Sequence, residues 1–311
     1  MKTRQLLPVR ILALLVLALC GARGEAQSTS VVDQVPAAAT IDLFASTDAD
    51  HTQVVRSGID LDWAHTGEDQ YAGIRVEKAW FAPLGQATTS FDRVYGRYAD
   101  KNNRLAWSAQ VGTDGHTVLG SLNVSDASPY RKEFFLERDI VETPRGVGQG
   151  IYYTFGGFAL DVPLTDRDSA TAVVGAQQFT GKNVRLHLRG NYVHVVKPDW
   201  GLSVQLRTRY FHSTVPGEYD YFSPRWYAEV LPVIQVRRYS GGWRYLVAAG
   251  YGGQGDAGSK WRPSRYFNAQ VSSPVNRHIQ LKASVIYSNT PVGTGYVYHY
   301  LQGALSLTSR L

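Results

Sequence analysis

The chain has 311 residues, with 32 lysines and arginines, 26 aspartates and glutamates and one cysteine. Its first 26 residues hold four basic side chains and one acidic one, so the formal net charge of +6 falls to +3 without them. That charge is too small to indicate a nucleic-acid partner. No run of 18 apolar residues follows residue 26, which excludes a membrane-spanning helix but not a membrane β-barrel.

Residues 1–26 are predicted to be a secretory signal peptide. Basic residues precede an apolar run at 11–20, and small residues then lead to a cleavage site after Ala26. Cleavage there removes Cys20, so the mature chain would have neither disulfide nor thiol chemistry. A lipoprotein acylated at Cys20 is the less favoured alternative, because the bulky Leu19 precedes it. The remaining organisation is a flexible periplasmic lead at 27–38 and a β-barrel at 39–311.

The rest of the chain alternates apolar and polar side chains in segments separated by Gly, Asp, Asn, Pro or Ser. A period of two is typical of β-strands. Most segments reach the roughly 9–11 residues that a tilted strand needs to cross a membrane, and single-chain bacterial barrels have an even number of strands. We predict sixteen strands, at 40–47, 52–63, 69–82, 87–99, 103–113, 116–126, 130–142, 149–163, 167–180, 183–196, 200–213, 222–237, 242–252, 260–272, 277–290 and 296–310.

The two faces of each segment indicate which solvent it meets. In 183–196, Leu186 and Leu188 share one face, while Arg185 and Arg189 share the other. Tryptophans lie mostly near segment ends, as in the aromatic girdles of membrane barrels. A soluble sandwich is the alternative, but it would leave open strand edges. The predicted fold is therefore an all-β, antiparallel, up-and-down transmembrane barrel of about 16 strands, in contact with lipid in the outer membrane of a Gram-negative bacterium.

The connections between the segments are short. With both chain ends on the periplasmic side, the odd-to-even connections would face outward. These include 143–148, 214–221 and 253–259, which are the longest but still short for a porin. No long loop is therefore available to fold into the barrel and constrict it.

The sequence shows no catalytic constellation. None of the eight histidines has a serine two residues later, which is the spacing that would place both on one strand face, as in lipid-modifying barrel enzymes. His212 and Ser213 are adjacent and so point to opposite faces. No histidine or cysteine pair and no carboxylate-rich loop indicates a metal. We expect a protein that is not an enzyme and needs neither metal nor cofactor.

Charged side chains alternate into the predicted lumen. Basic ones come from the second half of the chain and acidic ones mainly from the first half. One interpretation is structural, with opposite charges pairing across the lumen. The other is a polar path for a hydrated substrate, with Tyr227, Tyr298 and Tyr300 stacking on sugar rings. The predicted path residues are Arg185, Arg189, Arg207, Arg209, Arg225, Tyr227, Glu229, Arg237, Arg244, Asp60 and Asp62.

The stretch EYDYFSPRWYAEVLPVIQVRRYSGGWRY, residues 218–245, resembles a passage in the C-terminal barrels of outer-membrane exopolysaccharide exporters. These include the cellulose and poly-N-acetylglucosamine exporters and the YaiO-type barrels. A Tyr/Phe-Ser-Pro-x-x-Tyr element there opens a strand that ends in basic residues before a turn and a Trp strand. The matching residues are Tyr221, Phe222, Ser223, Pro224, Tyr227, Arg237, Arg238 and Trp243.

The resemblance implies a passive conduit that exports an exopolysaccharide. The exporters carry a helical-repeat (TPR) periplasmic arm, which this sequence lacks. We therefore expect its partners to include a separate TPR periplasmic protein and an inner-membrane glycosyltransferase, but no nucleic acid. A general or solute-specific porin is the first alternative function, and a lipid-modifying outer-membrane enzyme is the second.

Overall fold

The computed structural model describes residues 36–49, 51–274, 279–290 and 299–311. The predicted signal peptide, most of the predicted lead and Tyr298 lie outside the described residues. None of the helices in the described ranges is long and apolar enough to cross a membrane.

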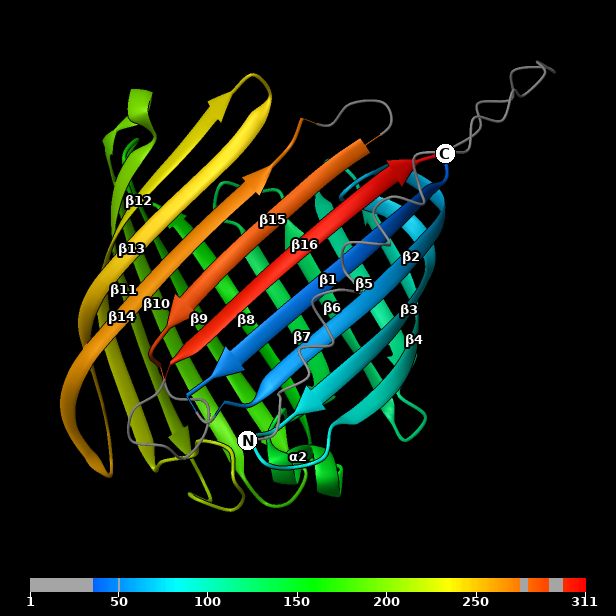
Figure 1. Ribbon diagram of the computed structural model, residues 1–311. Coiled ribbons are helices and arrows are strands. Elements are labelled where there is room, and N and C mark those ends of the chain that lie inside the picture. Colours follow the sequence, from blue (N-terminus) through cyan, green and yellow to red (C-terminus); the bar gives the residue numbers. More distant parts are fainter. Residues whose placement is uncertain (1–35, 50, 275–278, 291–298) are drawn as a thin grey trace, which may run out of the picture. The chain divides into compact units, whose positions relative to one another are not determined.

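The described residues form one closed barrel of sixteen antiparallel strands, each paired with its neighbours in the sequence (Figure 1). A short helix, α2 (Pro144–Gln149), follows β7, and a 3-10 turn, η1 (Pro198–Trp200), follows β10. The strands are β1 (Ala38–Asp48), β2 (Gln53–Gly67), β3 (Gln70–Ala82), β4 (Thr89–Lys101), β5 (Leu105–Thr113), β6 (Val118–Asp126), β7 (Lys132–Ile140), β8 (Tyr152–Pro163), β9 (Asp168–Phe179), β10 (Val184–Lys197), β11 (Leu202–Ser213), β12 (Trp226–Ser240), β13 (Trp243–Asp256), β14 (Ser259–Ser272), β15 (Ile279–Ser288) and β16 (Tyr300–Arg310).

Pairing between β1 and β16 closes the barrel. The register runs from Ala38 opposite Arg310 to Asp48 opposite Tyr300, so the first and last strands pair along their whole length. Closure removes the unpaired backbone groups that an open sheet would expose to lipid. The predicted all-β, sixteen-stranded up-and-down barrel is confirmed.

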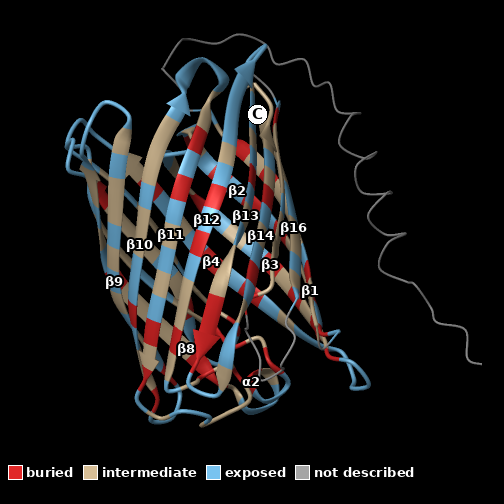
Figure 2. Cartoon of the chain, turned by 90° about the vertical axis from the view of Figure 1, so that its left-hand side faces the viewer, coloured by how far each residue is buried: buried red, intermediate tan, exposed pale blue. Residues whose placement is uncertain are grey.

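Side chains alternate between the lumen and the outer surface as the sequence pattern predicts. On β2, Ile59 and Leu61 are 47% and 49% exposed on the outside, whereas Asp60 and Asp62 are each 3% exposed on the inside. The same alternation of buried and exposed residues is visible along the strands in Figure 2. The polar side chains are therefore the shielded ones, which is the reverse of a water-soluble sandwich.

Some basic side chains, among them Lys78, Arg138 and Arg265, point outward and depart from this pattern. Lys78 on β3 pairs with Asp92 on β4 at 2.7 Å, and Arg138 donates to the Thr154 hydroxyl at 2.9 Å. Arg265 lies opposite Tyr251 on the outer face. Ion pairing, hydrogen bonding and the reach of a long side chain to the interface lower the cost of a charge near lipid.

A matched pair of arginine substitutions tests which face meets lipid. Leu188 is 54% exposed on the outside of β10, and Leu188→Arg is expected to lower the unfolding free energy in lipid vesicles by about 2–4 kcal/mol. Ser121 faces the lumen on β6, opposite Glu137, so Ser121→Arg should change stability little. Urea titration of both variants measures the difference. Equal stabilities would contradict the assignment of the two faces.

Candidate functional site

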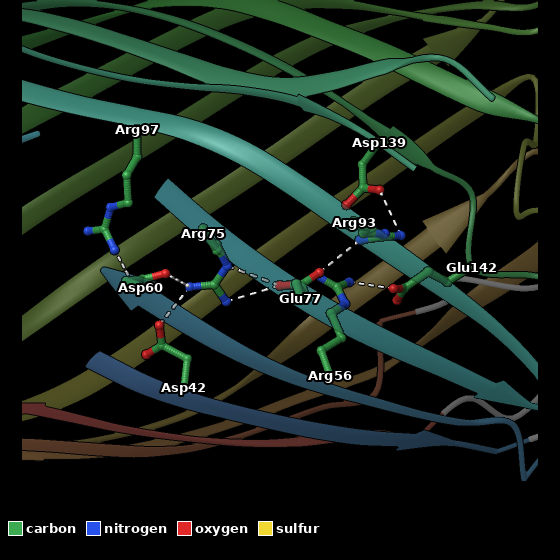
Figure 3. A network of polar contacts seen from close by, with 9 residues as sticks. All are labelled: Asp42, Arg56, Asp60, Arg75, Glu77, Arg93, Arg97, Asp139 and Glu142. Carbon is green, nitrogen blue, oxygen red and sulfur yellow. Dashed lines mark hydrogen bonds and ion pairs between the residues drawn. The ribbon is translucent and has the colours of Figure 1, made fainter. Parts of the chain in front are cut away.

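One wall of the lumen is held by a network of ion pairs centred on Arg75 of β3 (Figure 3). Its Nη1 lies 2.6 Å from Asp42 Oδ2 on β1 and 2.9 Å from Asp60 Oδ1 on β2, and its Nη2 lies 3.0 Å from Glu77 Oε2. Gly58 makes room for the guanidinium, because a Cβ at that position would lie 2.6 Å from Nη2. Each of these carboxylates therefore has an arginine partner from its own wall.

The network continues across β4 to β7. Arg93 binds Glu77 at 3.2 Å and Asp139 at 3.2 Å. Arg97 pairs with Asp60, and its Nε lies 3.6 Å from Asp62, which also binds His65 Nδ1 at 2.8 Å. A charge-assisted network in which every member has a partner makes a rigid wall.

A loop reaches into the barrel at the end where odd-numbered strands lead to even-numbered ones. Glu142, just after β7, forms an ion pair with Arg56 of β2, five strands away in the sheet (Figure 3). Because no sheet neighbour joins these two residues, the contact spans the inside of the barrel. The loop that turns inward here, at 141–151, is a short one.

Hydrogen bonds between loops explain why the short 141–151 loop turns inward. The Thr143 hydroxyl caps α2 through the Gly146 amide and donates to Asp220 of the 214–225 loop at 2.6 Å. Asp220 also accepts from the Arg145 amide at 2.8 Å. Glu218 of the 214–225 loop accepts from the Lys182 amide at 2.7 Å and the Asn183 amide at 2.9 Å. The two loops and the β9–β10 turn thus form one cap.

The residues that resemble the exporter motif build this cap. Tyr221 is 3% exposed and stacks on Phe179, with ring centroids 4.1 Å apart. The Ser223 hydroxyl accepts from the Gly217 amide at 3.0 Å, and Phe222 offers its carbonyl to Arg185. Pro224 completes the loop, and Trp243 instead begins β13 at the opposite end of the barrel.

Four arginines line the opposite wall, on β10 and β11. Arg189 and Arg209 are directly paired in the strand register, Arg207 faces Asn191, and Arg185 lies nearer the cap. No ion pair joins any of the four to a carboxylate among the described residues. This wall is unlike the network wall, where each arginine binds at least one carboxylate.

Aromatic rings support these arginines in place of carboxylates. The guanidinium carbon of Arg185 lies 4.5 Å from the Phe211 ring centroid, and that of Arg189 lies 5.6 Å from Phe155. Arg207 lies 4.8 Å from Tyr266, and Arg209 lies 5.1 Å from Tyr227. Cation–π contacts orient a guanidinium without neutralising its charge. We call these four residues the arginine wall: Arg185, Arg189, Arg207 and Arg209.

Glu229 is the carboxylate nearest to this wall in register, since it is paired with Arg209. Its Oε1 instead accepts hydrogen bonds from the Ser264 hydroxyl and, at 3.1 Å, from the Thr290 hydroxyl. Tyr227 is 0% exposed and donates to Gln254 at 3.0 Å. The expectation that Tyr227 stacks on sugar rings is therefore wrong, because its faces are covered. Tyr300 is half-buried at the start of β16.

The remaining predicted path residues lie at the two rims. Arg225 is exposed in the loop before β12, and Arg237 is exposed near the other end of that strand. Arg244 lies 3.9 Å from Glu68 of the β2–β3 turn, which also binds Lys282 at 2.9 Å. Among the predicted residues, charge pairing across the lumen therefore holds for Arg244, while Asp60 and Asp62 are bound within the network wall.

The sequence interpretation missed the arginines that neutralise the acidic wall. Arg75 and Glu77 alternate with Ile74 and Val76 on β3, so the same parity rule places both in the lumen. The members not named beforehand are Asp42, Arg56, Arg75, Arg93, Arg97 and Glu142. Within the described ranges, no group of three or more histidine, cysteine, aspartate or glutamate residues could hold a metal ion.

The lumen is not filled by these side chains. A cavity of about 250 Å³ lies between the network wall and strands β15 and β16. Its lining includes Asp60, His65, Arg97, Gln280 and Lys282. A hollow, polar interior inside a closed wall is the architecture of an outer-membrane-type barrel rather than of a packed core.

No family model matches the chain, and no curated protein matches its sequence. Among solved structures, a bacterial polysaccharide outer membrane secretin has a TM-score of 0.67 at 13% identity, covering 88% of this chain and 98% of its own. The CymD monoaromatic hydrocarbon channel has a TM-score of 0.42 at 12% identity, with 89% of each chain covered. Pseudomonas aeruginosa OccK5 has a TM-score of 0.42 at 9% identity, with 89% of this chain and 98% of its own covered. The similarity establishes the fold, a barrel of the outer-membrane type.

Proposed function

We propose that this chain is a passive outer-membrane conduit through which an exopolysaccharide leaves the cell. The observation that carries the proposal is the interior of one closed barrel, where a rigid network wall borders a polar cavity of about 250 Å³ and a separate arginine wall lines other strands. The likeness to a polysaccharide secretin supports the choice of cargo. Synthesis and extrusion at the inner membrane would supply the energy, through a separate glycosyltransferase and a TPR periplasmic protein.

A general porin is the competing function, and the cap distinguishes the two. Glu142 of the 141–151 loop reaches Arg56 of β2 along the inside of the network wall, which favours a barrel that is nearly closed at rest. In planar bilayers we expect few open-channel events from the wild-type protein, whereas a porin would conduct steadily. Steady wild-type conductance at neutral pH would contradict the export proposal.

Protonation of Glu142 should open the cap. Burial raises the pKa of Glu142, and the nearby Asp139 acts in the same direction, while Arg56 and Arg93 oppose them. A raised pKa means that this carboxyl binds a proton at a less acid pH than an exposed glutamate, so acidification breaks its ion pair with Arg56. We expect wild-type conductance to rise as pH falls, and Glu142→Gln to conduct at neutral pH with little further pH dependence. Conductance of Glu142→Gln that matches the wild type at every pH would show that this pair does not hold the cap.

A further inference from the structure

We infer that the cargo of this conduit is an acidic polysaccharide, whose carboxylate or sulfate groups travel along the arginine wall. The inference rests on the proposed function and adds the chemical class of the substrate to it. It depends on three properties of the lumen: arginines without a carboxylate partner, their spacing along the barrel, and the binding of the facing wall's carboxylates by arginines of that wall.

The charge of the arginine wall is available to a ligand. None of the four guanidiniums binds a carboxylate of the described residues: Arg207 donates to the neutral Gln205, at 2.9 and 3.0 Å, and Arg185 donates to the Phe222 carbonyl. Arg189 is exposed to the lumen. Arginine presents donors in a planar fork that matches carboxylate and sulfate oxygens, and a hydrogen bond to such an anion is stronger than one to a neutral hydroxyl.

The basic side chains form a track rather than a single pocket. Arg207 is paired with Asn191, six residues from Arg185 on β10, which corresponds to about 20 Å along the strand. Arg189 and Arg209 lie between these two levels. Arg237 extends the track towards one rim, and Arg225 stands at the other. A small anion needs convergent donors at one point, whereas a charged polymer is served by donors spaced along its path.

The facing wall does not cancel this preference. Its carboxylates Asp42, Asp60, Glu77 and Asp139 are each bound by an arginine of the same wall, so they offer little free negative charge to repel an anion. His187, which lies between Arg185 and Arg189, makes its hydrogen bond to the neutral Gln177 at 3.2 Å. The arginine wall therefore holds four guanidiniums without a carboxylate partner among the described residues, and Glu229 is the negative charge beside Arg209 in register.

The test measures binding of labelled oligosaccharides to the full barrel in detergent at low salt. The probes are a galacturonate oligomer, a sulfated heparin oligosaccharide and a neutral maltodextrin of similar length. We expect the acidic probes to bind, the neutral one to bind at least tenfold more weakly, and added salt to weaken only the acidic probes. Arg189→Gln with Arg209→Gln should lower the affinity for acidic probes about tenfold or more.

The matched control is Arg238→Gln with Arg265→Gln, which removes the same charge from the outer surface. It should leave binding unchanged, and heat-modifiable migration on gels checks that both double variants are folded. Suppose that acidic and neutral probes bind equally and that Arg189→Gln with Arg209→Gln does not change their binding. This result would contradict an acidic cargo but not the proposed export function. Displacement by inorganic phosphate at the affinity of the oligomers would indicate a small-anion site and overturn the polymer. If no probe binds and the wild-type protein conducts steadily, both the acidic cargo and the export function are contradicted.

Discussion

Replacing Arg75 with methionine is expected to destabilise the barrel more than any other single change in the lumen, by about 3–5 kcal/mol. Arg75 is the shared partner of Asp42, Asp60 and Glu77, and its side chain is only 16% exposed. Removing it leaves three carboxylates in one shielded place, with Asp60 and Glu77 less than a tenth exposed. Urea unfolding in lipid vesicles measures the loss, and the temperature at which the folded form disappears on gels gives a second readout.

The matched control is Arg207→Met, which removes an arginine from the other wall of the same barrel. Arg207 binds no carboxylate, and its donors go to Gln205 on its own strand. Its loss should cost about 1 kcal/mol or less. Arg75→Lys keeps the charge but has no planar fork, so its stability should fall between those of the wild type and Arg75→Met. Similar losses of unfolding free energy for Arg75→Met and Arg207→Met would contradict the inference that the network wall stabilises the barrel more than the arginine wall does.

The strands could be predicted from the sequence because their signal is local. In segment 183–196, apolar and basic residues alternate from Val184 to Arg189, and the observed strand is Val184–Lys197. Segment 130–142 was predicted too long, because Val141 and Glu142 continue the pattern but leave the wall to enter the cap. Periodicity reports which face a residue would take in a strand, and it does not report where the strand ends.

The contacts of the site could be predicted only in part. The alternation of side chains along the strands placed Arg209 and Glu229 in the lumen. It could not show that Glu229 accepts hydrogen bonds from Ser264 and Thr290. The choice of partner depends on the register of three or more strands and on loops that return to the interior. Tyr227 illustrates the same limit, since its inward direction was correct and yet Phe211 and Gln254 cover it.

The two walls of the lumen differ in the groups that their arginines contact. Arg93 and Asp139 join β4 to β7, so the network braces the curved sheet from inside where the strands β5–β7 are short. The arginine wall has no such ion pair among the described residues: Arg185 donates to the Phe222 carbonyl, and the guanidiniums lie against aromatic rings such as Phe211 and Tyr266. We therefore expect substitutions in the network wall to change stability, and substitutions in the arginine wall to change it less.

Reversing the charge of the arginine wall should change its preference from acidic to basic oligosaccharides while leaving the barrel folded. In the wild type, Arg189 and Arg209 are like charges paired in the strand register. In Arg207→Glu with Arg209→Glu, position 209 becomes acidic and forms an opposite-charge pair with Arg189. Repulsion from two new carboxylates should lower the affinity for a galacturonate oligomer about a hundredfold, and a cationic glucosamine oligomer should bind in its place. Oligosaccharide binding and transport are measured beside heat-modifiable migration on gels. A variant that loses this migration would show that the arginines hold the wall together, and one that stays folded with unchanged preference would show that the cargo does not touch them.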